Sequence, residues 1–100
     1  PGTRILLLGL FPLWEQPDHP HRAWVKQVNE LIKPLADRQR VWYLDLGDKF
    51  LEPDGTISRL KLRDLLHLSE IGYGLWATNM RPYLRDLLKG KGQGAMWGPR

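Results

Sequence analysis

Two short apolar runs decide the fold of this chain: Arg4–Phe11, RILLLGLF, and Val41–Leu46, VWYLDL. Each is nearly continuous in apolar residues, which is typical of a strand buried on both faces in a parallel sheet. Between the runs, apolar residues recur three and four positions apart, as on one face of a helix, at Trp24, Val25, Val28, Leu31, Ile32 and Leu35. A strand, a helix and a second buried strand predict a parallel βαβ unit, so the expected fold class is α/β.

A final helix is expected over Glu70–Leu88. Ser69 is placed to cap its amino end, and the negative charge of Glu70 suits the helix dipole in the first turn. The last twelve residues, Lys89–Arg100, contain four glycines and three basic residues. We expect them to form a flexible tail after a domain spanning residues 1–88, with Trp97 as the one feature that could dock.

Composition limits what kind of protein this can be. One hundred residues, 42% of them hydrophobic and five of them tryptophan, fit one small globular domain. The absence of cysteine excludes disulfide scaffolds, cysteine-ligated metal sites and thiol nucleophiles. The longest apolar run is far shorter than the roughly 20 residues of a membrane-spanning helix. These features do not fix the compartment.

The net charge of +4 and the pI of about 9.7 would suit a polyanionic partner if the charge were concentrated. Basic and acidic residues instead alternate along most of the chain, which is typical of a solvated mixed surface. A nucleic-acid-binding function would have to rest on Lys89, Lys91 and Arg100. We therefore expect no nucleic-acid partner.

Asp64 and His67 are the most informative pair of residues. In a helical turn this spacing places a carboxylate and an imidazole on the same side, so the aspartate can accept a hydrogen bond from one ring nitrogen. That bond fixes the tautomer and leaves the other nitrogen free to take a proton from a nucleophile. The competing interpretation is a capping aspartate beside an ordinary half-buried histidine.

The surrounding pattern extends this signal. PDGTIS at Pro53–Ser58 and DLLHLS at Asp64–Ser69, followed by Gly72 and Tyr73, resemble the last block of the SGNH hydrolases, the GDSL-type lipases and esterases. Within that family the pattern is most similar to the branch that holds the catalytic subunits of platelet-activating factor acetylhydrolase Ib and their bacterial relatives. The resemblance runs from Arg4 to Leu88. It implies a flavodoxin-like three-layer α/β fold, of which these residues are the C-terminal βαβ unit and final helix.

The resemblance also implies a function. It makes His67 the general base and Asp64 its orienting carboxylate in a Ser-His-Asp triad that hydrolyses esters, of acetylated lipids or carbohydrates, without metal or cofactor. The family takes its nucleophile from a Gly-Asp-Ser block and its oxyanion donors from that serine, a glycine and an asparagine. None of these blocks is present, so the chain alone is expected to be inactive.

Local residues are poor substitutes for the missing groups. Ser69 is better explained as the helix cap, and Ser58 lacks the strained elbow that presents a nucleophile. Asn29 and Asn79 fall within predicted helices, so neither matches the asparagine of the family.

The loop after the first strand carries the expected substrate contacts. Trp14 stands at the carboxyl end of that strand and could line an acyl or glycosyl pocket, together with Leu66 and Leu68 beside His67. Arg22 matches a recurrent basic position of the resembling family, whereas the usual arginine after the strand-end proline is replaced by Leu13-Trp14.

The same loop contains a group of metal-ligating side chain types, but their spacing does not suit a metal. Prolines at positions 17 and 20 hold the loop extended, and nothing supplies the fixed spacing that zinc prefers. We therefore expect no metal site at Glu15, Asp18, His19 and His21.

An isolated two-stranded sheet would expose an apolar strand edge. We therefore expect weak folding, self-association through that edge, or dependence on a missing N-terminal half. The alternative function is a non-catalytic α/β interaction module that pairs through the same edge.

Overall fold

The computed structural model describes residues 2–99 and confirms the parallel βαβ unit. Strand β1 (Ile5–Leu8) pairs with β2 (Val41–Leu44) in parallel, with Ile5 opposite Val41 and Leu8 opposite Leu44. Helix α1 (Pro20–Ile32) connects the two strands, and helix α2 (Glu70–Leu88) follows them. Short 3₁₀ turns complete the chain at Lys33–Leu35, Gly47–Phe50 and Ala95–Trp97.

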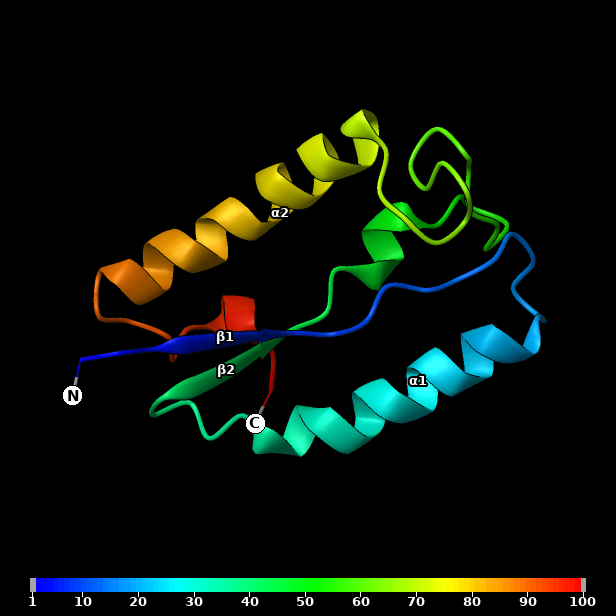
Figure 1. The fold of residues 1–100 in the computed structure, drawn as a ribbon. Helices are drawn as coiled ribbons and strands as arrows, with labels where there is room; N and C mark the ends of the chain where they lie inside the picture. Colours follow the sequence, from blue (N-terminus) through cyan, green and yellow to red (C-terminus); the bar gives the residue numbers. More distant parts are fainter. Residues whose placement is uncertain (1, 100) are drawn as a thin grey trace.

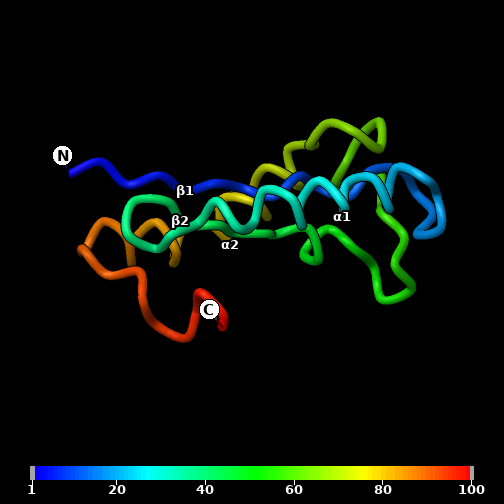
Figure 2. The backbone as a smooth tube through the Cα atoms, turned by 90° about the horizontal axis from the view of Figure 1, so that it is seen from below, coloured from blue at the N-terminus to red at the C-terminus, as the bar shows by residue number. Residues whose placement is uncertain are grey.

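The sheet lies between the two helices. In Figure 1, α2 runs along one side of the strands and α1 along the other. Figure 2 looks along this stacking, with α1 in front of the sheet and α2 behind it. Neither helix of the described residues is long and apolar enough to cross a membrane.

Both strands are shorter than the apolar runs that predict them, and a buried asparagine explains the end of β1. The N–H of Leu10 donates to Oδ1 of Asn29 at 2.8 Å, and Nδ2 of Asn29 donates to the Leu10 carbonyl at 3.0 Å. Asn29 thus satisfies both backbone groups of Leu10 in the way that a strand partner would. The chain is thereby tied to α1 where it leaves the sheet.

The sequence predicts that both strands are buried on both faces, and this prediction is wrong. Trp42 and Leu44 are buried, whereas Val41 and Tyr43 on the same strand are half-buried and Ile5 of β1 is 52% exposed. The reason is the size of the sheet, since each strand has a single neighbour and an open edge.

Helix α2 has the predicted bounds, and its cap is confirmed. Oγ of Ser69 accepts the N–H of Gly72 at 3.0 Å. Gly72 itself packs against the preceding loop, because a Cβ there would come within 2.1 Å of the Lys61 carbonyl oxygen. Any larger residue at position 72 would push the helix away from that loop.

Two clusters form the core. One is built from Phe50, Ile57, Leu62 and Leu68 in the long connection before α2. The other joins β2, α2 and the C-terminal segment through Trp42, Leu87 and Trp97.

The C-terminal segment packs through Trp97, the one residue of the expected flexible tail that could dock. Trp97 is only 7% exposed, packs edge-on against Tyr83, and donates from Nε1 to the Asp86 carboxylate at 2.8 Å. Trp42 donates in turn to the Gly92 carbonyl at 2.8 Å. The glycines and basic residues indicate a tail. The free energy gained by burying the Trp97 indole offsets the entropy cost of ordering the residues around it.

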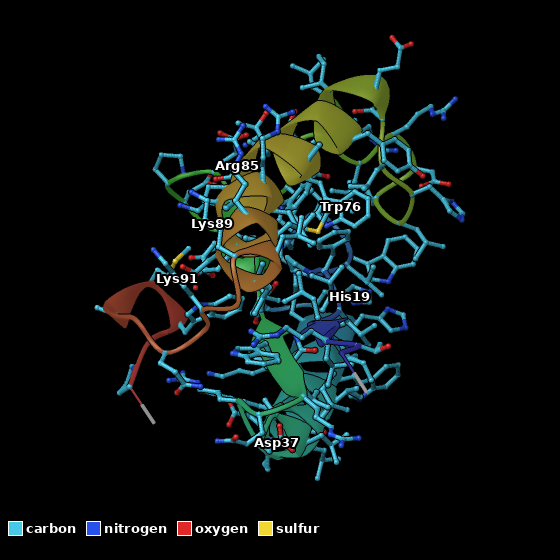
Figure 3. All side chains as sticks on the ribbon, turned by 90° about the vertical axis from the view of Figure 1, so that its left-hand side faces the viewer. His19, Asp37, Trp76, Arg85, Lys89 and Lys91 are labelled. Carbon is cyan, nitrogen blue, oxygen red and sulfur yellow. The ribbon has the colours of Figure 1, made fainter. Side chains whose placement is uncertain are left out.

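Basic side chains gather at the carboxyl end of α2, where Figure 3 shows Arg85, Lys89 and Lys91. Cations at this position complement the negative end of the helix dipole. Arg100, the remaining basic residue of the predicted tail, lies outside the described residues.

Trp97→Ala should lower the free energy of unfolding by about 3–5 kcal/mol, because it leaves a cavity against Trp42 and removes the bond to Asp86. Trp24→Ala is the matched control, since that indole is 56% exposed. Urea unfolding of both variants followed by circular dichroism tests this. Equal losses in the two variants would contradict the packing role of Trp97.

Candidate functional site: the Asp64–His67 turn

The Asp64–His67 turn is closed by two buried leucines. Leu62 and Leu68 form an antiparallel bridge, and the N–H of Arg63 donates to the His67 carbonyl at 3.1 Å. Leu65 between them is 5% exposed. Hydrophobic anchors at both ends therefore hold a five-residue turn whose polar side chains face outward.

Asp64 and His67 meet as the sequence predicts. Nδ1 of His67 lies 2.6 Å from Oδ2 of Asp64. The other carboxylate oxygen, Oδ1, accepts the N–H of Leu66 at 3.0 Å and that of His67 at 2.6 Å. The carboxylate is therefore fixed by the backbone of its own turn, and it faces Nδ1 of the imidazole.

The local geometry is not the expected helical turn. Leu65 has a φ of +65°, in the left-handed region, so the chain reverses between Asp64 and His67. This conformation costs a non-glycine residue about 1–2 kcal/mol. Sequence reasoning missed the special role of Leu65, because a glycine or asparagine would signal such a turn and a leucine does not.

Hydrogen bonding holds the pKa of Asp64 well below its ordinary value of 3.8. The largest cause is the bond to the His67 ring, followed by the bond from the His67 backbone N–H. The side chains of Asp64 and His67 are 54% and 71% exposed. The carboxylate thus stays ionised and accessible at neutral pH.

Trp14 lies beside this turn. Its backbone N–H donates to the Leu65 carbonyl at 3.2 Å, and its side chain is partly exposed. The indole centroid lies 5.3 Å from the ring of His19 and 5.5 Å from that of His21. The structure therefore brings the loop after β1 to the Asp64–His67 turn.

The two leucines named as pocket residues have different environments. Leu66 is 52% exposed next to His67. Leu68 instead packs in the core with Phe50, Ile57 and Leu62, so it supports the turn and does not face outward. Leu68 pairs with Leu62 at the base of the turn, whereas Leu66 lies within the turn itself.

Both serine hydroxyls of the chain are engaged with backbone groups. Oγ of Ser69 accepts from Gly72 and donates to the carbonyls of Leu60 and Lys61. Oγ of Ser58 accepts the N–H of Leu60 at 3.0 Å. Their local roles are caps.

The histidines after β1 serve the start of α1. Nδ1 of His19 accepts the N–H of His21 at 3.1 Å, and the two rings stack 4.8 Å apart. Within residues 2–99, no three acidic or histidine side chains are grouped to hold a metal ion. Asn29 and Asn79 lie in α1 and α2, where Asn79 donates to the Leu75 carbonyl.

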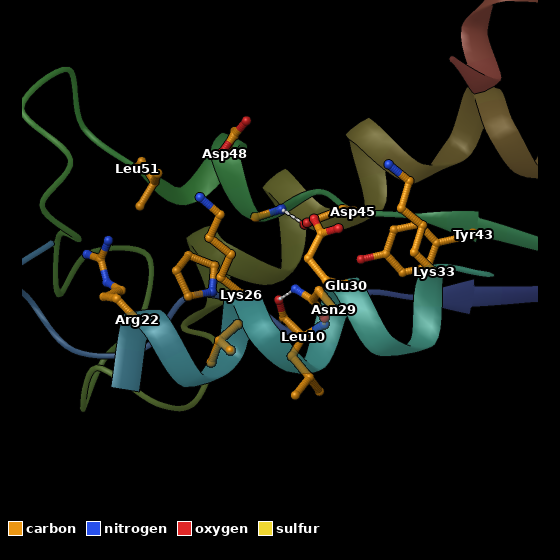
Figure 4. A pocket seen from close by; sticks show the side chains of 13 residues that line it. Leu10, Arg22, Lys26, Asn29, Glu30, Lys33, Tyr43, Asp45, Asp48 and Leu51 are labelled. Carbon is orange, nitrogen blue, oxygen red and sulfur yellow. Dashed lines mark hydrogen bonds between the residues drawn. The ribbon is translucent and has the colours of Figure 1, made fainter. Parts of the chain in front are cut away.

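A cavity of about 410 Å³ lies between α1 and the carboxyl end of β2 (Figure 4). Its lining combines cations with acids, and none of residues 64–68 contributes to it. Tyr43 stands in this cavity, and burial raises its pKa to about 12, with Asp45 and Glu30 adding to the effect. The mixed lining does not favour one class of charged ligand.

Comparison with known proteins places this site in a family. A sequence model of the GDSL-like lipase/acylhydrolase family matches residues 1–75. The chain belongs to this family. Human platelet-activating factor acetylhydrolase IB subunit alpha1 is 40% identical to it over 97 residues, which is 95% of this chain and 42% of the relative. The alpha2 subunit from Rattus norvegicus is 34% identical over 90 residues, which is 89% of this chain and 39% of that subunit. This member of the family thus spans about two fifths of the length of these relatives.

The Asp64 carboxyl should titrate below pH 3.8, the ordinary value. Its pKa is lower in the folded chain than in the unfolded one, so its stabilising effect is complete above about pH 4 and is lost as the pH falls. Carbon-13 chemical shifts of the carboxyl measure this midpoint. His67→Ala should move the midpoint upward, whereas Glu15→Gln should not; a native midpoint at or above 3.8 would contradict the pairing.

Proposed function

We propose that this chain supplies the acid–base half of a Ser-His-Asp esterase site, with His67 as general base and Asp64 as the carboxylate that orients it. The observation that supports this most directly is the 2.6 Å contact between Nδ1 of His67 and Oδ2 of Asp64 in a GDSL-like family member. The hydrogen bonds that keep Asp64 ionised favour the same roles.

The proposed chemistry follows from this orientation. An ionised carboxylate facing Nδ1 requires a proton on that nitrogen, so Nε2 carries the lone pair. Nε2 takes the proton of a serine hydroxyl as its oxygen attacks the ester carbonyl, and the resulting imidazolium gives that proton to the departing alcohol. Water then attacks the acyl-enzyme with the same base, which releases the acid and restores the serine.

The nucleophile and the oxyanion donors would come from another segment of the protein. Ser58 and Ser69 are both occupied as caps, and the chain spans about two fifths of its relatives. The open edge of β1 offers a place for that segment, since Leu6 and Leu8 direct their backbone groups away from β2. A further parallel strand there would extend the sheet toward the flavodoxin-like three-layer fold.

We propose a short acyl ester, such as an acetyl ester, as the substrate. The relatives are named as acetylhydrolase subunits. Trp14 and Leu66 supply partly exposed apolar side chains beside the Asp64–His67 pair, as an acyl group would require. Lipid and carbohydrate acetyl esters share this chemistry.

A chimera tests the proposed roles. In it, these 100 residues replace the matched segment of the human alpha1 subunit. We expect the chimera to hydrolyse p-nitrophenyl acetate, and His67→Ala to lower its kcat at least ~10³-fold, because the serine loses its base. Asp64→Asn should also lower kcat strongly, because it allows the wrong tautomer.

Glu70→Gln is the matched control, since Glu70 is an exposed acid near the turn with no bond to it. The unmodified 100-residue chain should show no turnover. Activity of the chimera that survives His67→Ala would contradict the role of His67, and turnover by the chain alone would contradict an external nucleophile.

A non-catalytic interaction module remains the second candidate, and one observation favours it. Exposed apolar residues follow one stripe of α1 and the turn after it, at Trp24, Val28, Leu31 and Leu35. Sedimentation of the chain alone at micromolar concentration distinguishes the functions. Stable stoichiometric dimers together with an inactive chimera would favour the module.

A further inference from the structure

Arg22, in the first turn of α1, binds backbone carbonyl groups. Its Nε donates to the Leu13 carbonyl at 2.8 Å, and its Nη2 donates to those of Trp14 at 3.0 Å, Glu15 at 3.1 Å and Gly55 at 2.9 Å. No carboxylate of the described chain lies within ion-pair distance of it. The guanidinium therefore clamps residues 13–15 onto the turn at Gly55.

The shape of the guanidinium matters as much as its charge. Desolvation lowers the pKa of Arg22, and the groups that face its cation are backbone carbonyl dipoles. A planar fork of donors can reach several carbonyl groups at once, whereas a lysine ammonium is a compact point charge on a flexible stem. Lysine would therefore hold this loop only in part.

Residues 13–15 in turn bind the long connection between β2 and α2. The N–H of Trp14 donates to the Leu65 carbonyl at 3.2 Å, and the Glu15 carbonyl accepts the N–H of Ile57 at 3.2 Å. Residues 13–15 thus lie between Arg22 on one side and the connection that carries Asp64 and His67 on the other.

This link joins two residues in the left-handed region. Trp14 has a φ of +69° and Leu65 a φ of +65°. Each conformation persists only where its surroundings enforce it. If residues 13–15 were released, Leu65 would relax toward negative φ. That rotation would carry the N–H groups of Leu66 and His67 away from Oδ1 of Asp64.

We propose that Arg22 is a positioning residue for the Asp64–His67 pair, acting through the loop at residues 13–15 and through Leu65. The proposal rests on the proposed esterase function for its effect on catalysis. Its effect on the geometry of the pair stands independently of that function.

Arg22→Gln and Arg22→Lys in the chimera described above test the proposal. Nuclear magnetic resonance gives two readouts, the titration of the Asp64 carboxyl and the nitrogen-15 shifts that report which ring nitrogen of His67 carries the proton. We expect Arg22→Gln to raise the Asp64 midpoint toward 3.8 and to mix the two His67 tautomers. Arg22→Lys should shift both readouts less.

Two controls separate positioning from loss of charge and loss of stability. Arg81→Gln removes an exposed cation from α2, and Val25→Ala removes a buried side chain from α1. Neither should move the Asp64 titration or the His67 tautomer. In the assay, Arg22→Gln should lower kcat between ~10-fold and ~100-fold, with a smaller change in KM, because the base is misplaced and not removed.

A folded Arg22→Gln chimera with native Asp64 titration and native His67 tautomer would overturn the proposal. If that variant fails to fold, the same result for a folded Arg22→Lys chimera would overturn it. If the pair is disturbed as expected but the chimera with Arg22 intact hydrolyses no ester, the positioning role stands and the proposed function fails.

Discussion

Because β1 and β2 run parallel, the segments that follow both strands leave from the same end of the sheet. The loop with Trp14 and the long connection with Asp64 and His67 therefore start on the same side of the molecule. In an antiparallel pair the two segments would leave from opposite ends. The hydrogen bond from the Trp14 backbone N–H to the Leu65 carbonyl forms at this end.

Backbone dipoles carry most of the electrostatics at this end of the molecule. The Arg22 guanidinium donates to four backbone carbonyl groups, and Asp64 is held by the amides of Leu66 and His67 as well as by the imidazole. Asp37 follows the same rule elsewhere, because three backbone N–H groups bring its pKa to about 2. Charges fixed in this way need no opposite charge as a partner, so Asp64 remains accessible in a site that is open to solvent.

The side chains of Asp64 and His67 are exposed to solvent in the described residues. The three leucines beneath the pair, Leu62, Leu65 and Leu68, are buried. They hold the backbone of the turn in place while the side chains of Asp64 and His67 stay exposed. In a triad the water around the imidazole would be displaced by the segment that brings the nucleophile. The open edge of β1 and the apolar stripe on α1 show that other surfaces of the chain are also uncovered.

The helices, the strands and the contact between Asp64 and His67 could all be predicted from local patterns in the chain. Apolar runs and helical spacing predicted β1, α1, β2 and α2, although most of the apolar stripe on α1 is exposed. The pairing of Asp64 with His67 could be predicted because the two residues lie three positions apart, where local geometry alone brings them together. The resemblance of residues 4–88 to a hydrolase family could be recognised in the same local motifs.

Long-range contacts determine how Asp64 and His67 are held. The left-handed conformation of Leu65, the burial of Leu68 and the clamp formed by Arg22 depend on contacts between residues far apart in the chain, which no local pattern encodes. The docking of Trp97 is of the same kind. A glycine-rich segment with basic residues indicates disorder. The surface formed by β2 and α2 buries the Trp97 indole, and this burial offsets the entropy lost when the segment is ordered.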